Sequence, residues 1–238
     1  MTEFRIKSRL VSLASAVVLF FGLSTSAMAV SLGFGVSGGA THAEFEGAET
    51  IKENNSKSTR HEEAQGVLGS AYVQLVVGED MFGEANGFAL GYEHIFGEAV
   101  IDAKKSERDK LDLQGTASTV SSYRNYAEAT VKNLRTIFVE TPGFTRMGLY
   151  LKAGWSDMDI ITNEQLATGG VYGDASTDGI TYGFGFKKAA GGMQVKTEFN
   201  YTDWDDISIS NTGTDAGASK VTADPENWAF KFSVGYNF

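Results

Sequence analysis

The chain has 238 residues and not one cysteine. Without cysteine it can form no disulfide, which excludes a small secreted scaffold held together by disulfide bridges. A lipid anchor on an N-terminal cysteine is excluded for the same reason. The stability of the fold must therefore come from non-covalent contacts.

Long apolar runs are also missing. The uncharged stretch 10–23 is too short to cross a bilayer comfortably, and no later run approaches the ~20 apolar residues of a membrane helix. If the rest of the chain spans a membrane, only a closed barrel remains, because every backbone polar group in lipid must be paired internally.

The N-terminus has the three-part pattern of a secretory signal. Basic residues precede the uncharged stretch, and small residues follow it at the two positions that a signal peptidase reads: Arg5, Lys7 and Arg9, then Ala27 and Ala29. The pattern predicts a signal peptide over residues 1–29, cleaved after Ala29, and a single barrel domain over residues 30–238. An uncleaved N-terminal anchor is the alternative.

Positive charge is scarce in the predicted mature chain. Residues 30–238 hold 17 Lys and Arg against 29 Asp and Glu, a net charge of −12. Nucleic-acid-binding proteins usually carry a basic patch that neutralises phosphates, so nucleic acid is not expected as a partner.

Eight segments show apolar side chains at every second residue, the period of a β-strand. The clearest is the last, where Trp228 to Phe238 alternates with small and polar residues. In the least regular segment, 131–140, we expect Leu134, Thr136 and Phe138 to face outward and Arg135 inward. The eight segments are 30–36, 67–77, 88–92, 131–140, 147–155, 180–186, 195–201 and 228–238.

The connections between these segments alternate in length. Three are short and rich in turn residues (78–87, 141–145 and 188–192), and four are about twenty residues or longer (46–65, 103–128, 157–178 and 205–227). This alternation is typical of an all-β, up-and-down transmembrane barrel of eight antiparallel strands. We expect short periplasmic turns, four long extracellular loops and both termini on the periplasmic side.

The polar side of each strand indicates which face looks inward. It consists of Gly, Ser, Thr, Asn and a few charges, which would make a poor soluble core but suits a narrow, filled lumen. The charges expected to share the lumen are Glu93, Arg135, Lys152, Lys196, Glu198 and Lys231. A soluble, lipocalin-like barrel with the apolar face inside is the alternative.

The last strand, 231–238, resembles the terminal strand of small outer-membrane barrels. The stretch 182–206 is similar to the penultimate hairpin of OmpA-type and opacity-type barrels, in which a tyrosine-rich strand runs into an Asp-rich loop. This resemblance implies a Gram-negative outer-membrane location. It implies contact with lipid and lipopolysaccharide, and a signal at Tyr236 and Phe238 that is read by the barrel-assembly machinery. We expect a monomer.

Few motifs point to chemistry. Residues 33–38 match a dinucleotide fingerprint, but they lie within a strand pattern, whereas the fingerprint opens a helix. No motif places a Ser or an Asp beside His42, His61 or His94, as a catalytic site would require. The acidic stretches 157–178 and 203–227 offer oxygen ligands but no calcium-loop spacing. We therefore predict no cofactor, no metal ligand and no catalytic residue.

These observations favour a non-enzymatic outer-membrane protein with a structural or adhesion-like surface role. Three alternatives remain open: a narrow pore for ions or small solutes, a barrel enzyme acting on outer-membrane lipid, and a soluble periplasmic binder. The charge-filled lumen predicted for eight strands argues against free diffusion through the barrel.

Overall fold

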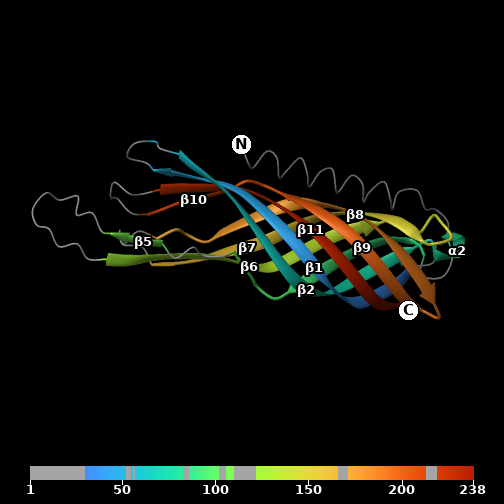
Figure 1. The fold of residues 1–238 in the computed structure, drawn as a ribbon. Helices are drawn as coiled ribbons and strands as arrows, with labels where there is room; N and C mark the ends of the chain where they lie inside the picture. Colours follow the sequence, from blue (N-terminus) through green and yellow to red (C-terminus); the bar gives the residue numbers. More distant parts are fainter. Residues whose placement is uncertain are drawn as a thin grey trace, which may run out of the picture.

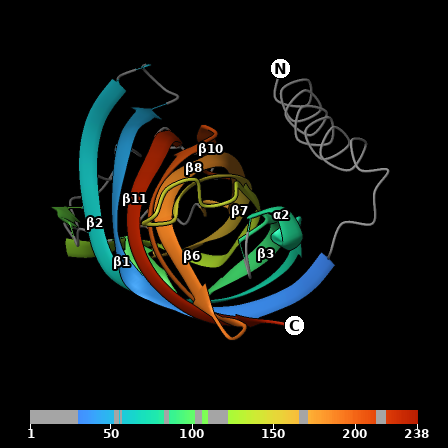
Figure 2. The same ribbon diagram turned by 90° about the vertical axis from the view of Figure 1, so that its right-hand side faces the viewer.

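The computed structural model describes residues 30–51, 55, 57–82, 86–101, 106–109, 122–165, 171–212 and 219–238. The predicted signal peptide and its residues Ala27 and Ala29 lie outside these ranges. Within them, no helix is both long and apolar enough to cross a membrane. Most of the described chain is β-strand, arranged as one tilted ring (Figures 1 and 2).

Eight antiparallel strands form the ring, and it closes because β1 pairs with both β2 and β11. Closure leaves no free sheet edge in the barrel wall between the paired residues, as lipid requires. The predicted eight-stranded barrel is thus confirmed. The ring strands in order are β1 (Val30–Ile51), β2 (Lys57–Val77), β3 (Phe88–Phe96), β6 (Ser122–Glu140), β7 (Leu149–Gln165), β8 (Ala175–Ala190), β9 (Met193–Trp204) and β11 (Ser219–Asn237).

Short elements occupy the two ends of the barrel. The one-turn helix α2 (Glu79–Phe82) lies in the β2–β3 link, at the same end as the C-terminus (Figure 1). Three short strands pair with ring strands toward the other end: β4 (Ala99–Ile101) and β5 (Ser106–Asp109) with β6, and β10 (Ile207–Ser210) with β11.

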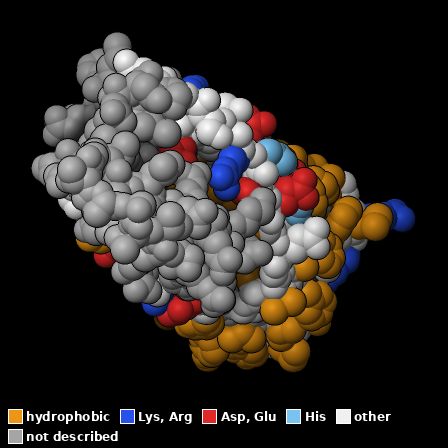
Figure 3. Space-filling view, turned by 60° about the vertical axis from the view of Figure 1, so that its left-hand side comes forward, with side chains coloured by type: hydrophobic (Ala, Val, Ile, Leu, Met, Phe, Trp, Pro, Cys, Tyr) orange, Lys and Arg blue, Asp and Glu red, His pale blue; other side chains and the backbone are white. Residues whose placement is uncertain are grey.

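The outer face of the ring is apolar. Large hydrophobic side chains are exposed on alternate residues, and aromatic pairs mark both margins of this belt. The rings of Tyr201 and Trp228 pack in a tilted arrangement with centroids 4.4 Å apart at the outer margin, and those of Tyr236 and Phe238 lie 5.0 Å apart at the other. Apolar outside, polar inside and aromatic at the margins are the features of a barrel that spans an outer membrane. Figure 3 shows part of the belt in orange, with acidic and histidine side chains beside it.

Several expected loops are strand instead. The stretch 46–65 is mostly a paired ribbon of β1 and β2 as far as Thr50 and Lys57, and β1 also pairs with β11 as far as Ile51 and Ser219. β7 likewise runs to Gln165, and β8 begins at Ala175. These extensions lie beyond the lipid belt, so neither face needs apolar residues, and the alternation that marks a membrane strand is absent. Most of the expected loop 103–128 lies outside the described residues.

The prediction for the inward and outward residues of β6 was wrong. Thr136 and Phe138 are buried on the inner face, and Ile137 is exposed on the outer face. The pairing of β6 with β7 shifts between Lys132 and Arg135, and Asn133 has a φ of 53°. A bulge of this kind adds one residue and exchanges the faces of the strand on either side of it.

Candidate functional site

Inward-facing residues from four strands meet near the middle of the barrel. Alternation along β3, β7, β9 and β11 sends Glu93, Lys152, Glu198 and Lys231 into the lumen, where all four are buried. Small residues on neighbouring strands leave room for these long side chains. Gly35 and Gly235, for example, both face the ring of Tyr72, and a Cβ at either position would collide with it.

Glu93 is the centre of the outer half of this cluster. Its carboxylate accepts hydrogen bonds of 2.6 Å from Lys231 Nζ and 3.3 Å from Lys152 Nζ. Ser70 Oγ donates a third bond of 2.7 Å. A buried carboxylate is stable only when its charge is compensated and its lone pairs are bonded, and Glu93 satisfies both conditions.

Glu198 joins the same two lysines from the opposite wall. Its carboxylate lies 3.2 Å from Lys152 Nζ and 3.5 Å from Lys231 Nζ, and Tyr150 donates a hydrogen bond of 2.8 Å to it. Each of the two lysines is therefore shared by two carboxylates. This arrangement joins β3, β7, β9 and β11 through side chains across the lumen.

Glu140 organises a second group of charges nearer the periplasmic turns. Lys196 Nζ lies 2.8 Å from its carboxylate, and Lys187 Nζ lies 3.8 Å away. Lys196 also sits over the Tyr72 ring, 4.4 Å from its centroid, which adds a cation–π contact. Lys187 donates to the backbone carbonyl of Thr141 at 2.8 Å and so joins the cluster to the β6–β7 link.

The whole cluster contains three carboxylates and four ammonium groups, all buried. We call this set the lumen cluster: Glu93, Glu140, Glu198, Lys152, Lys187, Lys196 and Lys231. Phe138 fills space within it, with Lys152 Nζ 4.2 Å from its ring centroid. Charges so closely paired fill this level of the lumen, and an ion passing through it would have to separate them.

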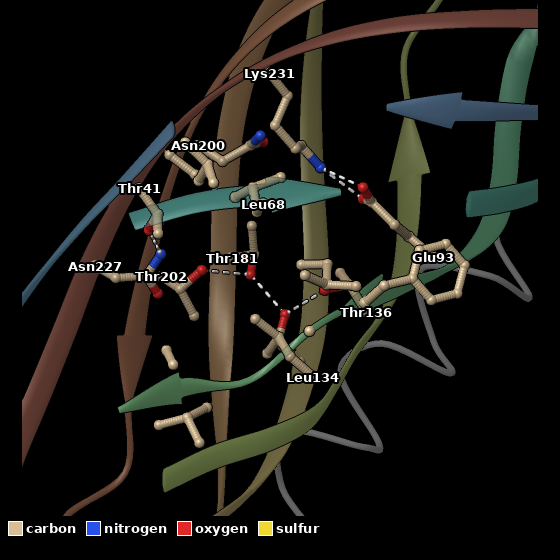
Figure 4. Close-up of a pocket in the computed structure, with 18 of the residues that line it drawn as sticks. Thr41, Leu68, Glu93, Leu134, Thr136, Thr181, Asn200, Thr202, Asn227 and Lys231 are labelled. Carbon is tan, nitrogen blue, oxygen red and sulfur yellow. Dashed lines mark hydrogen bonds and ion pairs between the residues drawn. The ribbon is translucent and has the colours of Figure 1, made fainter. Parts of the chain in front are cut away.

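A ladder of hydroxyl groups lies above the lumen cluster. The side-chain oxygens are separated by 2.8 Å from Thr136 to Ser156, by 2.7 Å from Ser156 to Thr181 and by 2.8 Å from Thr181 to Thr202. The ladder links β6, β7, β8 and β9 around one wall (Figure 4). Beyond it the lumen becomes apolar, with Met158, Ile160, Trp204 and Ile207 packed together.

A cavity of about 130 Å³ separates these layers. Its lining combines Glu93, Lys231 and the hydroxyl ladder with apolar residues that include Leu68, Leu134 and Trp204, and Figure 4 shows Leu68 and Leu134 among the polar groups. The protein interior thus changes from charged to apolar within one narrow space.

Five of the six charges predicted to face the lumen lie there and contact one another or Glu140. Arg135 does not, and its prediction was wrong. Its side chain is 44% exposed on the outer face and pairs with Asp157. Glu140 and Lys187 were missed. Glu140 shares the misread inner face of β6, and Lys187 lies on the polar side of segment 180–186, one residue beyond its end.

The other predicted motifs lie apart from this cluster. Residues 33–38 belong to β1 and open no helix. His42 lies 3.2 Å from Glu44, His61 lies 3.4 Å from Glu63, and His94 packs edge-on against Phe96. No group of three or more possible metal-binding side chains occurs within the part of the chain that the structure describes.

Neither a family model nor a curated protein sequence matches the chain. Similar solved structures include the outer membrane protease OmpT from Escherichia coli, with 9% identity, 90% of this chain and 100% of that chain covered, and a TM-score of 0.46. Ail, the attachment invasion locus protein of Yersinia pestis, in complex with the heparin analogue sucrose octasulfate, has 9% identity, coverage of 87% and 99%, and a TM-score of 0.41. Neisserial surface protein A has 12% identity, coverage of 86% and 97%, and a TM-score of 0.37. At such identities and scores the assignment of the fold rests on this chain's own strand pairing.

Proposed function

We propose that this outer-membrane barrel is a non-enzymatic, non-conducting protein that contributes to envelope structure and presents a surface for adhesion-like contacts. The observation that carries the proposal is the plugged lumen. Seven buried charges, a hydroxyl ladder and an apolar cluster occupy the barrel in succession. A narrow pore, the second candidate, would need a hydrated path through all three layers.

The strand extensions support the surface role. β1 and β2 continue as a paired ribbon to Thr50 and Lys57, well beyond the aromatic margin at Trp228. The described part of the ribbon carries more acidic than basic side chains: Glu44, Glu46, Glu49, Glu62 and Glu63 against Lys57 and Arg60. This acidic surface favours a cationic or hydrogen-bonding partner over an anionic glycan such as the heparin analogue in the Yersinia structure.

Conductance of the refolded protein in planar bilayers tests the proposal. We expect no reproducible channel openings at either polarity, because the ion pairs around Glu93 and Glu140 block the lumen. Reproducible current steps that change with Lys196→Met would establish the pore instead, because Lys196 lies in the path of any ion.

An enzymatic role requires a base, a nucleophile and an orienting group that converge in space. Among the described residues, His42 and His94 lie at different levels of β1 and β3, where His42 contacts Glu44 and His94 packs against Phe96. We expect cells carrying His42→Ala and His94→Ala to give the lipid A mass spectrum of cells with the unaltered protein. An altered spectrum would support a barrel enzyme.

The remaining assignments also belong to this proposal. Residues 1–29 are removed as a signal peptide, and the barrel-assembly machinery reads Tyr236 and Phe238. The mature barrel is a monomer surrounded by lipid and lipopolysaccharide. An oligomer in mild detergent, measured by light scattering, would contradict the assignment of a monomer.

A further inference from the structure

Among the described residues, the barrel wall has an opening between β2 and β4. β3 ends at Phe96, opposite Gly69 of β2, while β2 continues for twelve more residues, 57–68. β4 pairs with β6 through Ala99 and Val131, and no pairing joins it to β2 among the described residues. Gly97, with a φ of 103°, turns the chain away where β3 ends.

This opening lies at the outer margin of the lipid belt. β2 begins its membrane course at Val77, and a tilted strand crosses the hydrocarbon in about 9–11 residues, which brings the margin close to Val67. Val67 is 92% exposed and lines the opening. An apolar side chain at this position adjoins the acyl chains of the outer leaflet.

Behind the opening lies a mainly apolar chamber, whose lining also includes Glu98, Glu226 and Asn227. A cavity of about 350 Å³ continues into the 130 Å³ cavity above the lumen cluster, with Val67, Leu134 and Trp204 lining both. Ala43 and Ala64 face each other across β1 and β2, and their small side chains leave the chamber wide. An apolar cavity of ~150 Å³ in another protein stays dry and takes up benzene, so a chamber of this size has room for a larger hydrocarbon.

A ligand in the chamber needs no charged group, because the charged and hydroxyl side chains at the floor of the chamber are already paired. Lys231 and Glu93 are paired with each other, and the hydroxyls of Thr136, Thr181 and Thr202 are used within the ladder. At the mouth, Lys132 Nζ lies 2.8 Å from Glu98, with both side chains partly exposed. The chamber therefore suits the apolar end of an amphiphile, while the mouth can meet a polar head group.

We propose that an acyl chain of an outer-leaflet lipid enters the barrel through the opening between β2 and β4 and occupies this chamber. Its head group stays outside, near Lys132. This lipid site lies in the side wall of the barrel, and its existence does not depend on the proposed surface role. The barrel thus has a lipid-binding site in addition to its outer lipid contacts.

Tryptophan fluorescence provides the test, because Trp204 is the inward-facing member of the three tryptophans in the chain. The variant Trp155→Phe/Trp228→Phe leaves Trp204 alone as the reporter. It is refolded into phospholipid vesicles with ordinary or brominated acyl chains, since bromine quenches indole at near-contact range. We expect the brominated chains to remove most of the Trp204 emission.

The matched control adds Ala43→Phe, which fills the chamber without altering the outer face of β9. Emission in brominated vesicles should then largely return, and Ala64→Leu serves if the phenylalanine variant does not fold. Equal quenching in the open and filled barrels would overturn the proposal, because bromine would then act from outside β9. Strong quenching by aqueous acrylamide with none by bromolipid would also overturn it, because the chamber would hold water.

Discussion

At the scale of single residues, Glu93 is the most consequential side chain in the lumen. Glu93→Gln removes the charge that faces Lys231 and Lys152 but retains the shape. Breaking a buried ion pair costs about 3–5 kcal/mol, and we expect the lower end, about 3 kcal/mol, because Glu198 still faces both lysines. Urea unfolding of the refolded barrel in lipid vesicles measures this loss.

Two comparison variants make the Glu93 result specific. Glu63→Gln changes an exposed carboxylate on the ribbon and should alter stability by less than about 0.5 kcal/mol. Adding Lys231→Met to Glu93→Gln removes one of the two ammonium groups that would then share Glu198, and it should recover part of the lost stability. If Glu93→Gln is as mild as Glu63→Gln, the lumen cluster does not hold the barrel together.

How much of this cluster the sequence predicts depends on each strand's regularity. Lys152, Lys196, Glu198 and Lys231 follow from alternation because their strands run without interruption through the membrane. Arg135 was misassigned and Glu140 missed because both lie on β6, whose inner and outer faces were misread next to the bulge at Asn133. Hydrophobic periodicity cannot locate an added residue when both faces of a strand carry apolar side chains, as in Leu134 to Val139.

At the scale of elements, the bulge in β6 can be tested through its backbone. Asn133 has a φ of 53°, a conformation that β-branched residues adopt poorly and glycine adopts freely. Both Asn133→Val and Asn133→Gly lose the 2.8 Å hydrogen bond to Asp159. The difference in stability between the two variants therefore reports the cost of the backbone conformation alone. We expect Val to be less stable than Gly by about 1–2 kcal/mol in urea unfolding. Equal stability would mean that the bulge relaxes without cost.

The pairing of β10 with β11 should depend on pH. Partial burial raises the pKa of Asp224, and the neighbouring carboxylates of Asp206, Asp203, Glu226 and Glu46 raise it further. Folded Asp224 therefore binds its proton more tightly than the unfolded chain does, at a pH above the usual aspartate value of about 4. Stability is gained as the pH falls through this range and is lost as the pH rises through it.

Hydrogen exchange of the β10 amides checks this dependence. Corrected for the intrinsic exchange rate, exchange at 207–210 should slow as the pH is lowered from 7 to about 4.5, still above the usual aspartate pKa. Asp224→Asn should be slow at both pH values because it never carries the charge. If the exchange rates of Asp224→Asn kept the full pH dependence, other carboxylates would control the pairing of β10 with β11.

At the scale of the whole molecule, the sequence predicts the ring well and its extensions poorly. Lipid requires an apolar residue at every second position of a membrane strand, so the eight segments are visible in the sequence. Above the membrane, pairing such as Glu46 with His61 and Glu44 with Glu63 needs no apolar face. Strand and loop then look alike in the sequence, which is why the ribbon was expected to be a loop.

A substitution of the C-terminal residue, Phe238, can distinguish an effect on assembly of the barrel in cells from an effect on the stability of the folded barrel. Phe238 is 71% exposed and touches Phe34 and Tyr236 at ring distances of 5.5 and 5.0 Å, while its backbone nitrogen donates to Leu32. Phe238→Ala keeps that backbone bond and loses only aromatic contacts, so the refolded barrel should change in stability by about 1 kcal/mol or less. If the assembly machinery reads Phe238, the same variant should accumulate much less folded barrel in cells.

Heat-modifiable migration of the outer-membrane fraction measures assembly in cells, and urea unfolding measures stability in vitro. Phe230→Ala is the matched control, because Phe230 is also an exposed phenylalanine of β11 but lies in mid-strand. A terminal signal predicts an assembly defect for Phe238→Ala that is larger than that of Phe230→Ala, although the two barrels unfold alike. Equal defects would mean that cells respond to the apolar area of the strand, and that the terminal position has no special role.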